Sequence, residues 1–420
     1  MNNTTKSNTG PIVIIGILFF IFGFITWLNA TLIPYLKISC ELTSFESYLV
    51  TFAFYISYFV MALPSSFVLN KTGYKNGMSL GLAVMAFGAL LFIPAAYTRF
   101  YGLFLLGLFI MGTGLALLQT ASNPYVTILG PIESAARRIS IMGVANKVAG
   151  MLSPIILGTI ILEGSDKLEE KLETLSLVEK AAELDLLSEK VIIPYIIIAI
   201  SLALLAVFIK YSKLPEINID DDNTDTSMGE KTSIFQFPHL WLGALAIFVY
   251  VGAEVIAVDT LISYGKDLGF KMKEAKFFSS FTLFAMMPGY FFGIFAIPKY
   301  IKQDKALLLF ALLGIIFTII AITTEGYTSI LFIAALGLAN SIMWPAIWPL
   351  AIDGLGKFIK QGSAILVMAI AGGATIPLLY GYLSDIKTIG SQMAYIILIP
   401  LYIYIIFFAV WGHKFSSQKA

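Results

Sequence analysis

Two carboxylates, Glu254 and Asp259, lie inside a long apolar stretch of this chain, from about His239 to Tyr264. A helix rises 1.5 Å per residue, so such a stretch is long enough to cross a bilayer. An ionisable side chain at membrane depth is costly, so it faces protein or water and commonly has a function. The two acids are five positions apart, about 140° around a helix, so a paired acid dyad is not expected. The pattern predicts a membrane transporter in which Glu254 binds a driving ion or the substrate. In the alternative interpretation, one or both acids lie near an interface or pair with a buried lysine.

A second group of polar side chains falls within other apolar stretches. Asparagine and glutamine both donate and accept hydrogen bonds, as sugar hydroxyls do, and tryptophan offers a flat apolar surface with one N–H. A neutral polyol therefore needs amides and aromatic rings more than charges. The alternative is that these amides join helices, each contributing well under about 2 kcal/mol. We favour a sugar cavity, lined by Asn29, Gln119, Asn123, Asn146, Asn340 and Trp344.

The composition requires that these residues be carried by membrane helices. The chain has 420 residues, of which 58% are hydrophobic and 13% charged, with a mean hydropathy of +0.86. Soluble proteins contain about 25% charged residues. A net charge of +1 without a basic tract argues against nucleic acid as a partner. The single cysteine, Cys40, excludes an internal disulfide and a cysteine-rich metal site. No HExxH motif or Ser/His pair is present, so we expect neither an enzyme nor a bound cofactor or metal.

Apolar runs separated by charged or Gly/Pro-rich breaks predict an all-α membrane protein with twelve transmembrane helices. We expect an N-terminal six-helix bundle over 1–211, a cytoplasmic linker over 212–238 and a C-terminal six-helix bundle over 239–420. Residues 164–190 are predicted to form an amphipathic helical insertion outside the membrane. Two six-helix halves joined by a hydrophilic loop resemble the layout of the major facilitator superfamily. Lysine and arginine cluster in alternate loops, which predicts a multi-pass cytoplasmic-membrane protein with both termini in the cytoplasm.

Specific segments resemble one family in particular. The segment Gln119–Pro131 (QTASNPYVTILGP) is similar to its counterpart in the fucose–galactose–glucose:proton symporters, and Asn29–Pro34 and Tyr250–Ala253 fit the same family. The segment Trp344–Gly356 resembles the glucose/galactose branch. This resemblance implies a monomeric sugar transporter.

The sequence departs from the fucose branch at the two positions where that branch carries its proton and sugar carboxylates. Ala30 and Gln119 stand there, and neither can ionise. The resemblance therefore implies that Glu254 and Asp259 provide the ion coupling, with H⁺ or Na⁺ as the cotransported ion.

We therefore expect a secondary active transporter that imports a hexose, glucose and/or galactose, by cation-coupled symport with alternating access. The alternatives are an uncoupled hexose facilitator and a fucose-type symporter. Lys147, at the start of predicted span five, is expected to extend toward the cytoplasmic interface. Its alternative role is to pair with an acid inside the membrane. Asp385 is expected to be structural.

Overall fold

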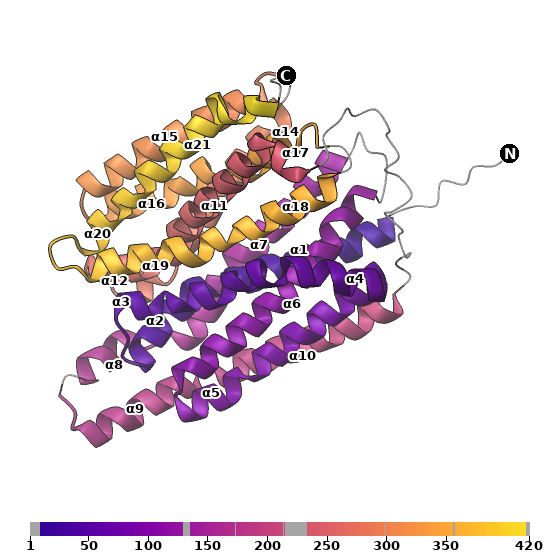
Figure 1. Cartoon of the computed structure of the whole chain (residues 1–420). Helices are drawn as coiled ribbons and strands as arrows, with labels where there is room; N and C mark the ends of the chain where they lie inside the picture. The colour runs from indigo at the N-terminus through magenta and orange to yellow at the C-terminus, as the bar shows by residue number, and fades with distance from the viewer. Residues whose placement is uncertain are drawn as a thin grey trace.

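The computed structural model describes residues 9–128, 135–172, 174–212, 214, 233–297, 299–355 and 358–416. Every regular element in these ranges is helical, and the helices run side by side between two ends of the molecule (Figure 1). We call the end that carries α3, α8, α9, α12 and α20 the insertion end, and the opposite end, where α1 begins and η7 lies, the terminal end. The predicted linker lies largely outside the described residues.

The N-half, residues 9–212, contains ten helices within its described part. They are α1 (Thr9–Thr26), α2 (Asn29–Ser39), α3 (Ser44–Ser47), α4 (Leu49–Leu90), α5 (Phe92–Thr98), α6 (Tyr101–Ile128), α7 (Ala135–Ile161), α8 (Ser165–Leu172), α9 (Leu177–Glu189) and α10 (Ile192–Tyr211). The predicted insertion over 164–190 is thus two helices, α8 and α9, since Ser176 and Glu179 form a capping box that starts α9.

The C-half, residues 233–416, is also helical in its described part. Its elements are η3 (Ile234–Gln236), α11 (Pro238–Asp259), α12 (Leu261–Asp267), α13 (Met272–Ala275), α14 (Phe278–Ala296), α15 (Gln303–Thr323), α16 (Gly326–Asn340), α17 (Met343–Ile352), α18 (Ile359–Met368), η5 (Ala369–Ala371), α19 (Gly372–Asp385), α20 (Gly390–Ala394), η6 (Tyr395–Ile397), α21 (Leu398–Val410) and η7 (Gly412–Ser416).

Eleven stretches among the described residues are long and apolar enough to cross a membrane. One of them, Ser44–Thr98, is 55 residues long and far exceeds a bilayer's thickness. It contains two predicted spans, because the backbone of Gly73 leaves the helical region (φ 75°, ψ 168°) inside α4. The chain reverses there, since a Cβ added at Gly77 would clash with Cδ2 of Leu69. Glycine adopts this positive φ without the steric cost that other residues incur. The expected twelve-helix layout is therefore consistent with these stretches.

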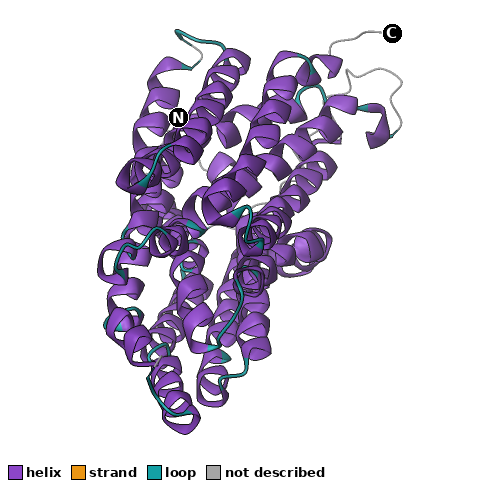
Figure 2. Ribbon diagram, turned by 90° about the vertical axis from the view of Figure 1, so that its left-hand side faces the viewer, coloured by secondary structure: helices purple, strands orange, loops and turns teal. Residues whose placement is uncertain are grey.

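Close backbone contacts hold the helices of each half together. A Cβ added at Gly88 of α4 would lie 2.7 Å from the amide nitrogen of Met111 and 2.8 Å from the carbonyl oxygen of Gly107, both in α6. Small residues at such crossings let membrane helices approach closely, where packing rather than the hydrophobic effect drives their association. Figure 2, which views the molecule from the insertion end, shows helices and the loops that join them at this end.

Spans one and seven each contain a short departure from regular helical structure. Trp27 and Leu28 separate α1 from α2 immediately before Asn29. Thr260 alone separates α11 from α12 immediately after Asp259. Spans one and seven correspond when a six-span unit is repeated, and α2 contacts both α11 and α12. Two of the predicted functional residues, Asn29 and Asp259, lie beside these irregular turns.

Candidate functional site

A buried ion pair joins the two halves at their centre. The ammonium of Lys147, on α7, lies 2.8 Å from Oε1 of Glu254, on α11. Lys147 is 7% exposed and Glu254 is 8% exposed, so both charges are removed from solvent. A buried charge is tolerated when it is paired and hydrogen-bonded. The pair is close to electrically neutral, which allows both residues to lie at membrane depth.

Two aromatic residues complete the surroundings of this pair. The hydroxyl of Tyr250, one turn before Glu254 on α11, donates to Oε2 of Glu254 at 2.7 Å. The ammonium of Lys147 lies 4.7 Å from the ring centroid of Trp27, which lies between α1 and α2. Each charge thus has a second partner. The expectation that Lys147 extends toward the interface was wrong, because its ammonium is buried against Glu254, which is the alternative role.

Asp259 has a different environment from Glu254. Its side chain is fully buried (0% exposed), and neither carboxylate oxygen has a hydrogen-bond partner among the described residues. It lies within electrostatic range of Glu254 and of Tyr55, on α4 of the other half. Lys147 contacts Glu254 instead. A buried, ionised carboxylate without a partner is unfavourable by several kcal/mol. The structure thus buries the Asp259 carboxylate without a described partner for its charge.

Two of the predicted amides are also buried with free hydrogen-bonding capacity. Asn29 is fully buried, and neither its side-chain nitrogen nor its oxygen has a partner within the described part of the chain. Asn340, at the end of α16, accepts from the hydroxyl of Tyr402 at 3.0 Å, while its Nδ2 has no described partner. Buried amides are normally satisfied, so this spare capacity is consistent with a polar ligand.

The remaining predicted sugar ligands are less distinctive. Asn146, on α7, donates to the carbonyl oxygen of Phe19 on α1 at 3.2 Å, which is the helix-joining role considered as the alternative. Trp344 is half-buried and stacks on Trp348 at a centroid distance of 5.1 Å. Gln119 is half-buried on α6, and the side chain of Asn123 lies outside the described part of the structure.

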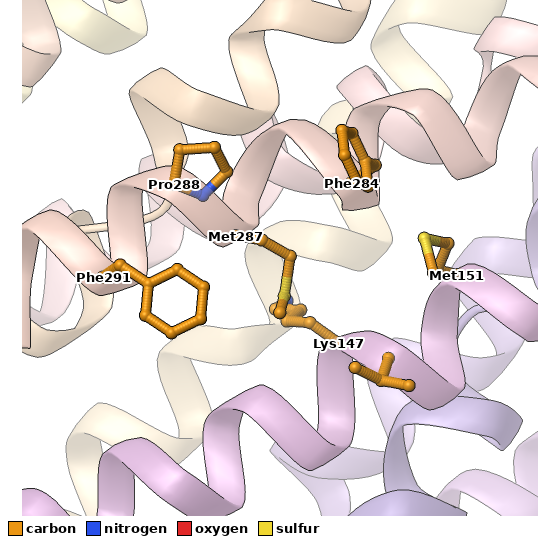
Figure 3. A pocket seen from close by; sticks show the side chains of 7 residues that line it. Lys147, Met151, Phe284, Met287, Pro288 and Phe291 are labelled. Atoms are coloured by element: carbon orange, nitrogen blue, oxygen red, sulfur yellow. The ribbon is translucent and has the colours of Figure 1, made fainter.

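A cavity of about 290 Å³ lies between α7 and α14, on the helices that join the halves beside Lys147. Figure 3 shows Lys147 next to Met287, with Phe284 and Phe291 from α14 on either side. The cavity is lined by Lys147, Val148, Met151, Phe284, Met287, Pro288 and Phe291. With one polar side chain among seven, it lacks the hydrogen-bonding groups that a sugar requires. The predicted sugar-binding residues whose side chains are described do not line it.

Some members of this central cluster were not predicted. Tyr250 lies four residues before Glu254, on the same helical face, so this spacing could have indicated the hydrogen bond. Trp27 carries no comparable signal, because its contact with Lys147 joins spans one and five.

Comparisons with known proteins agree with this architecture. The family model described as Major Facilitator Superfamily matches residues 15–376. The glucose/galactose transporter of Brucella abortus biovar 1 is 37% identical over 401 residues, covering 95% of this chain and 93% of the relative. The L-fucose-proton symporter of Escherichia coli K12 is 30% identical over 388 residues, covering 91% and 88%.

A solved structure gives the same result for the fold. The crystal structure of FucP, described as a Major Facilitator Superfamily transporter in the outward conformation, superposes with a TM-score of 0.73 at 29% identity, covering 99% of this chain and all of that one. The predicted resemblance and the all-α membrane fold are both confirmed. This chain belongs to the major facilitator superfamily.

Proposed function

We propose that this protein imports a hexose, glucose and/or galactose, across a cytoplasmic membrane by symport with H⁺ or Na⁺. The relatives support the substrate class, because proteins similar over almost the whole chain are named glucose/galactose transporter and L-fucose-proton symporter. We further propose that the protein is a monomer with both termini in the cytoplasm, so that the insertion end faces outward.

The single observation that carries ion coupling is the environment of Asp259. Glu254 is already neutralised by Lys147 at 2.8 Å, whereas Asp259 is fully buried without a partner among the described residues. We therefore assign the cotransported cation to Asp259 and give Glu254 a supporting role.

The sugar would bind beside this position. Asn29 is the first residue of α2 in span one, and its side-chain nitrogen and oxygen have no partner among the described residues. Asn340 and Trp344 of the C-half and Gln119, Asn123 and Asn146 of the N-half remain its proposed partners. The halves would rock as units, opening the site alternately to each side, and the Lys147–Glu254 pair would form where they close. A cation on Asp259 removes an uncompensated charge from the closed state, which couples its binding to that movement.

Transport in proteoliposomes tests the proposal. Radiolabelled glucose, with galactose and fucose as competitors, is offered under an inward H⁺ gradient or an inward Na⁺ gradient. We expect Asp259→Asn to exchange sugar in counterflow but to lose accumulation, because the amide cannot take up a cation. The matched control is Asp267→Asn, an exposed aspartate at the end of α12, which should accumulate sugar as the wild type does.

Other results of this transport assay would each refute one part of the proposal. Accumulation by Asp259→Asn at the wild-type level would remove Asp259 from coupling. Equilibration without accumulation by the wild type under either gradient would identify the uncoupled facilitator. Absence of uptake or competition by any of the three sugars would refute the hexose assignment.

A further inference from the structure

An acid from each half binds the other half at the insertion end. Asp166, on α8 of the N-half, accepts hydrogen bonds from the backbone amides of Met272 at 2.7 Å and Lys273 at 3.1 Å, the first two residues of α13. Asp385, the last residue of α19 in the C-half, accepts from the amides of Ser44 at 3.0 Å and Phe45 at 2.7 Å. Those are the first two residues of α3 in the N-half.

The two contacts have the same design. In each, both oxygens of one carboxylate receive the first two amides of a short helix, which an α-helix leaves without internal partners. Negative charge is also favourable at a helix N-terminus. Neither capped helix satisfies these two amides with its own N-cap side chain: Lys271 makes no such bond to α13, and Thr43 binds the third amide of α3. Each half therefore supplies the cap that the other half lacks.

The contacts also occupy corresponding places in the fold. Asp166 follows span five and caps the helix that leads into span eight, whereas Asp385 follows span eleven and caps the helix that leads into span two. Spans five and eleven correspond between the halves, as do spans two and eight, so exchanging the halves converts one contact into the other. The correspondence indicates that the two contacts are equivalent, because unrelated surface contacts would not be expected at symmetry-related positions.

We propose that Asp166 and Asp385 are reciprocal clamps that hold the insertion end closed and release when the transporter opens there. Alternating access requires the halves to separate at this end in one state. Both clamps cross between the halves, so separation breaks them together. Their groups lie at the exposed end of the molecule, where water replaces the lost hydrogen bonds, which makes the clamps reversible.

The Asp166 clamp has additional support. The ammonium of Lys266 binds Asp166 at 3.0 Å and Glu169 at 2.6 Å, and Lys276 binds Glu163 at 2.9 Å. All of these pairs join the N-half to the C-half. Asp385 has backbone amides as its described partners. The two clamps are therefore unequal, and loss of Asp166 should open this end more than loss of Asp385.

Distance measurements between spin labels test the clamps without any transport assay, so the outcome does not depend on the carried solute. Cys40 is first replaced by serine, and labels are placed at exposed Val178 in the N-half and exposed Lys387 in the C-half. We expect Asp166→Ala and Asp385→Ala each to raise the ratio of open to closed molecules at least about threefold. The double variant should multiply the two factors, because both clamps act on one equilibrium.

The matched control is Asp185→Ala. It removes the same charge at the same end, but Asp185 pairs with Arg99 inside the N-half at 3.3 Å. Its distance distribution should equal that of the unmutated, labelled protein. Asp385→Glu, which keeps the carboxylate, should restore part of the closed population, whereas a folding defect would not be rescued selectively. Clamp variants that match Asp185→Ala in a folded, monodisperse sample would overturn the proposal.

Discussion

The buried Lys147–Glu254 pair predicts a strongly non-additive response to substitution. Lys147→Met leaves Glu254 with the Tyr250 hydroxyl as its remaining partner, and Glu254→Gln leaves the Lys147 ammonium against the ring of Trp27. Removing one member of a buried ion pair costs about 3–5 kcal/mol, because the other charge stays buried and uncompensated. The double variant has no such charge, and the amide oxygen introduced by Glu254→Gln can still accept from Tyr250, so most of this loss should be recovered. We expect a coupling free energy of about 3 kcal/mol or more between the two positions.

Thermal unfolding of the purified protein in one detergent at pH 7 measures this effect. Both single variants should melt well below the wild type, with the double variant above either of them. The control pair is Lys180–Glu41, which lies on the surface with side chains 34% and 53% exposed. Exposed pairs contribute about 0–1 kcal/mol, so the equivalent substitutions there should have little effect. The reasoning is refuted if Lys147→Met is no more destabilising than Lys180→Met, or if the double variant shows the sum of the single losses.

Two further predictions concern helix packing and pH. Gly88→Leu should prevent the close approach of α4 and α6, because even a Cβ would lie 2.7 Å from the Met111 nitrogen, and thermal unfolding should show a large loss of stability. The control, Gly326→Leu, should lose less stability. A Cβ there meets nothing within 4 Å, so the cost comes only from the positive φ of Gly326. Closure of the insertion end should weaken in acid. Partial burial alone would raise the pKa of Asp166. The hydrogen bond from the Met272 amide and the ammonium of Lys266 outweigh this effect and hold the pKa below its ordinary value of 3.8. Lys266 also binds Glu169. The ionised Asp166 therefore supports closure fully at pH values above its ordinary pKa, and this support is lost as the pH falls through its lowered pKa. Label distances measured from pH 7 downward should lengthen in the unmutated protein and change less in Asp166→Asn.

The sequence was informative where a single residue contradicts its surroundings. Glu254 and Asp259 stand out because carboxylates are rare in apolar segments, and the structure places both in buried positions. Asn29 stands out because its polar amide lies within an apolar segment. Span positions were predictable from hydropathy because a bilayer sets the length of an apolar helix. Even the chain reversal near Gly73 is marked by charged neighbours.

Partners were harder to predict than positions. Lys147 is 107 residues from Glu254 in the chain, and its place near a predicted helix end equally suggested a side chain reaching for the interface. The clamps formed by Asp166 and Asp385 were beyond sequence reasoning, because their partners are backbone amides, which every residue except proline provides. Asn146 shows a third limit: an amide that joins helices and one that binds sugar have the same signature.

The contrast between the central pair and Asp259 has an electrical consequence. A membrane potential exerts a force on net charge, at about 2.3 kcal/mol per elementary charge for each 100 mV. Lys147 and Glu254 together carry almost no net charge, so the membrane potential has little effect on the contact that joins the halves. Asp259 has no counter-ion among the described residues, and its charge disappears when a cation binds. In a carrier loaded through Asp259, the potential therefore acts on the empty form, and an interior-negative voltage drives the bare carboxylate toward the outward-facing state. Returning empty, rather than carrying sugar inward, becomes the voltage-dependent half of the cycle.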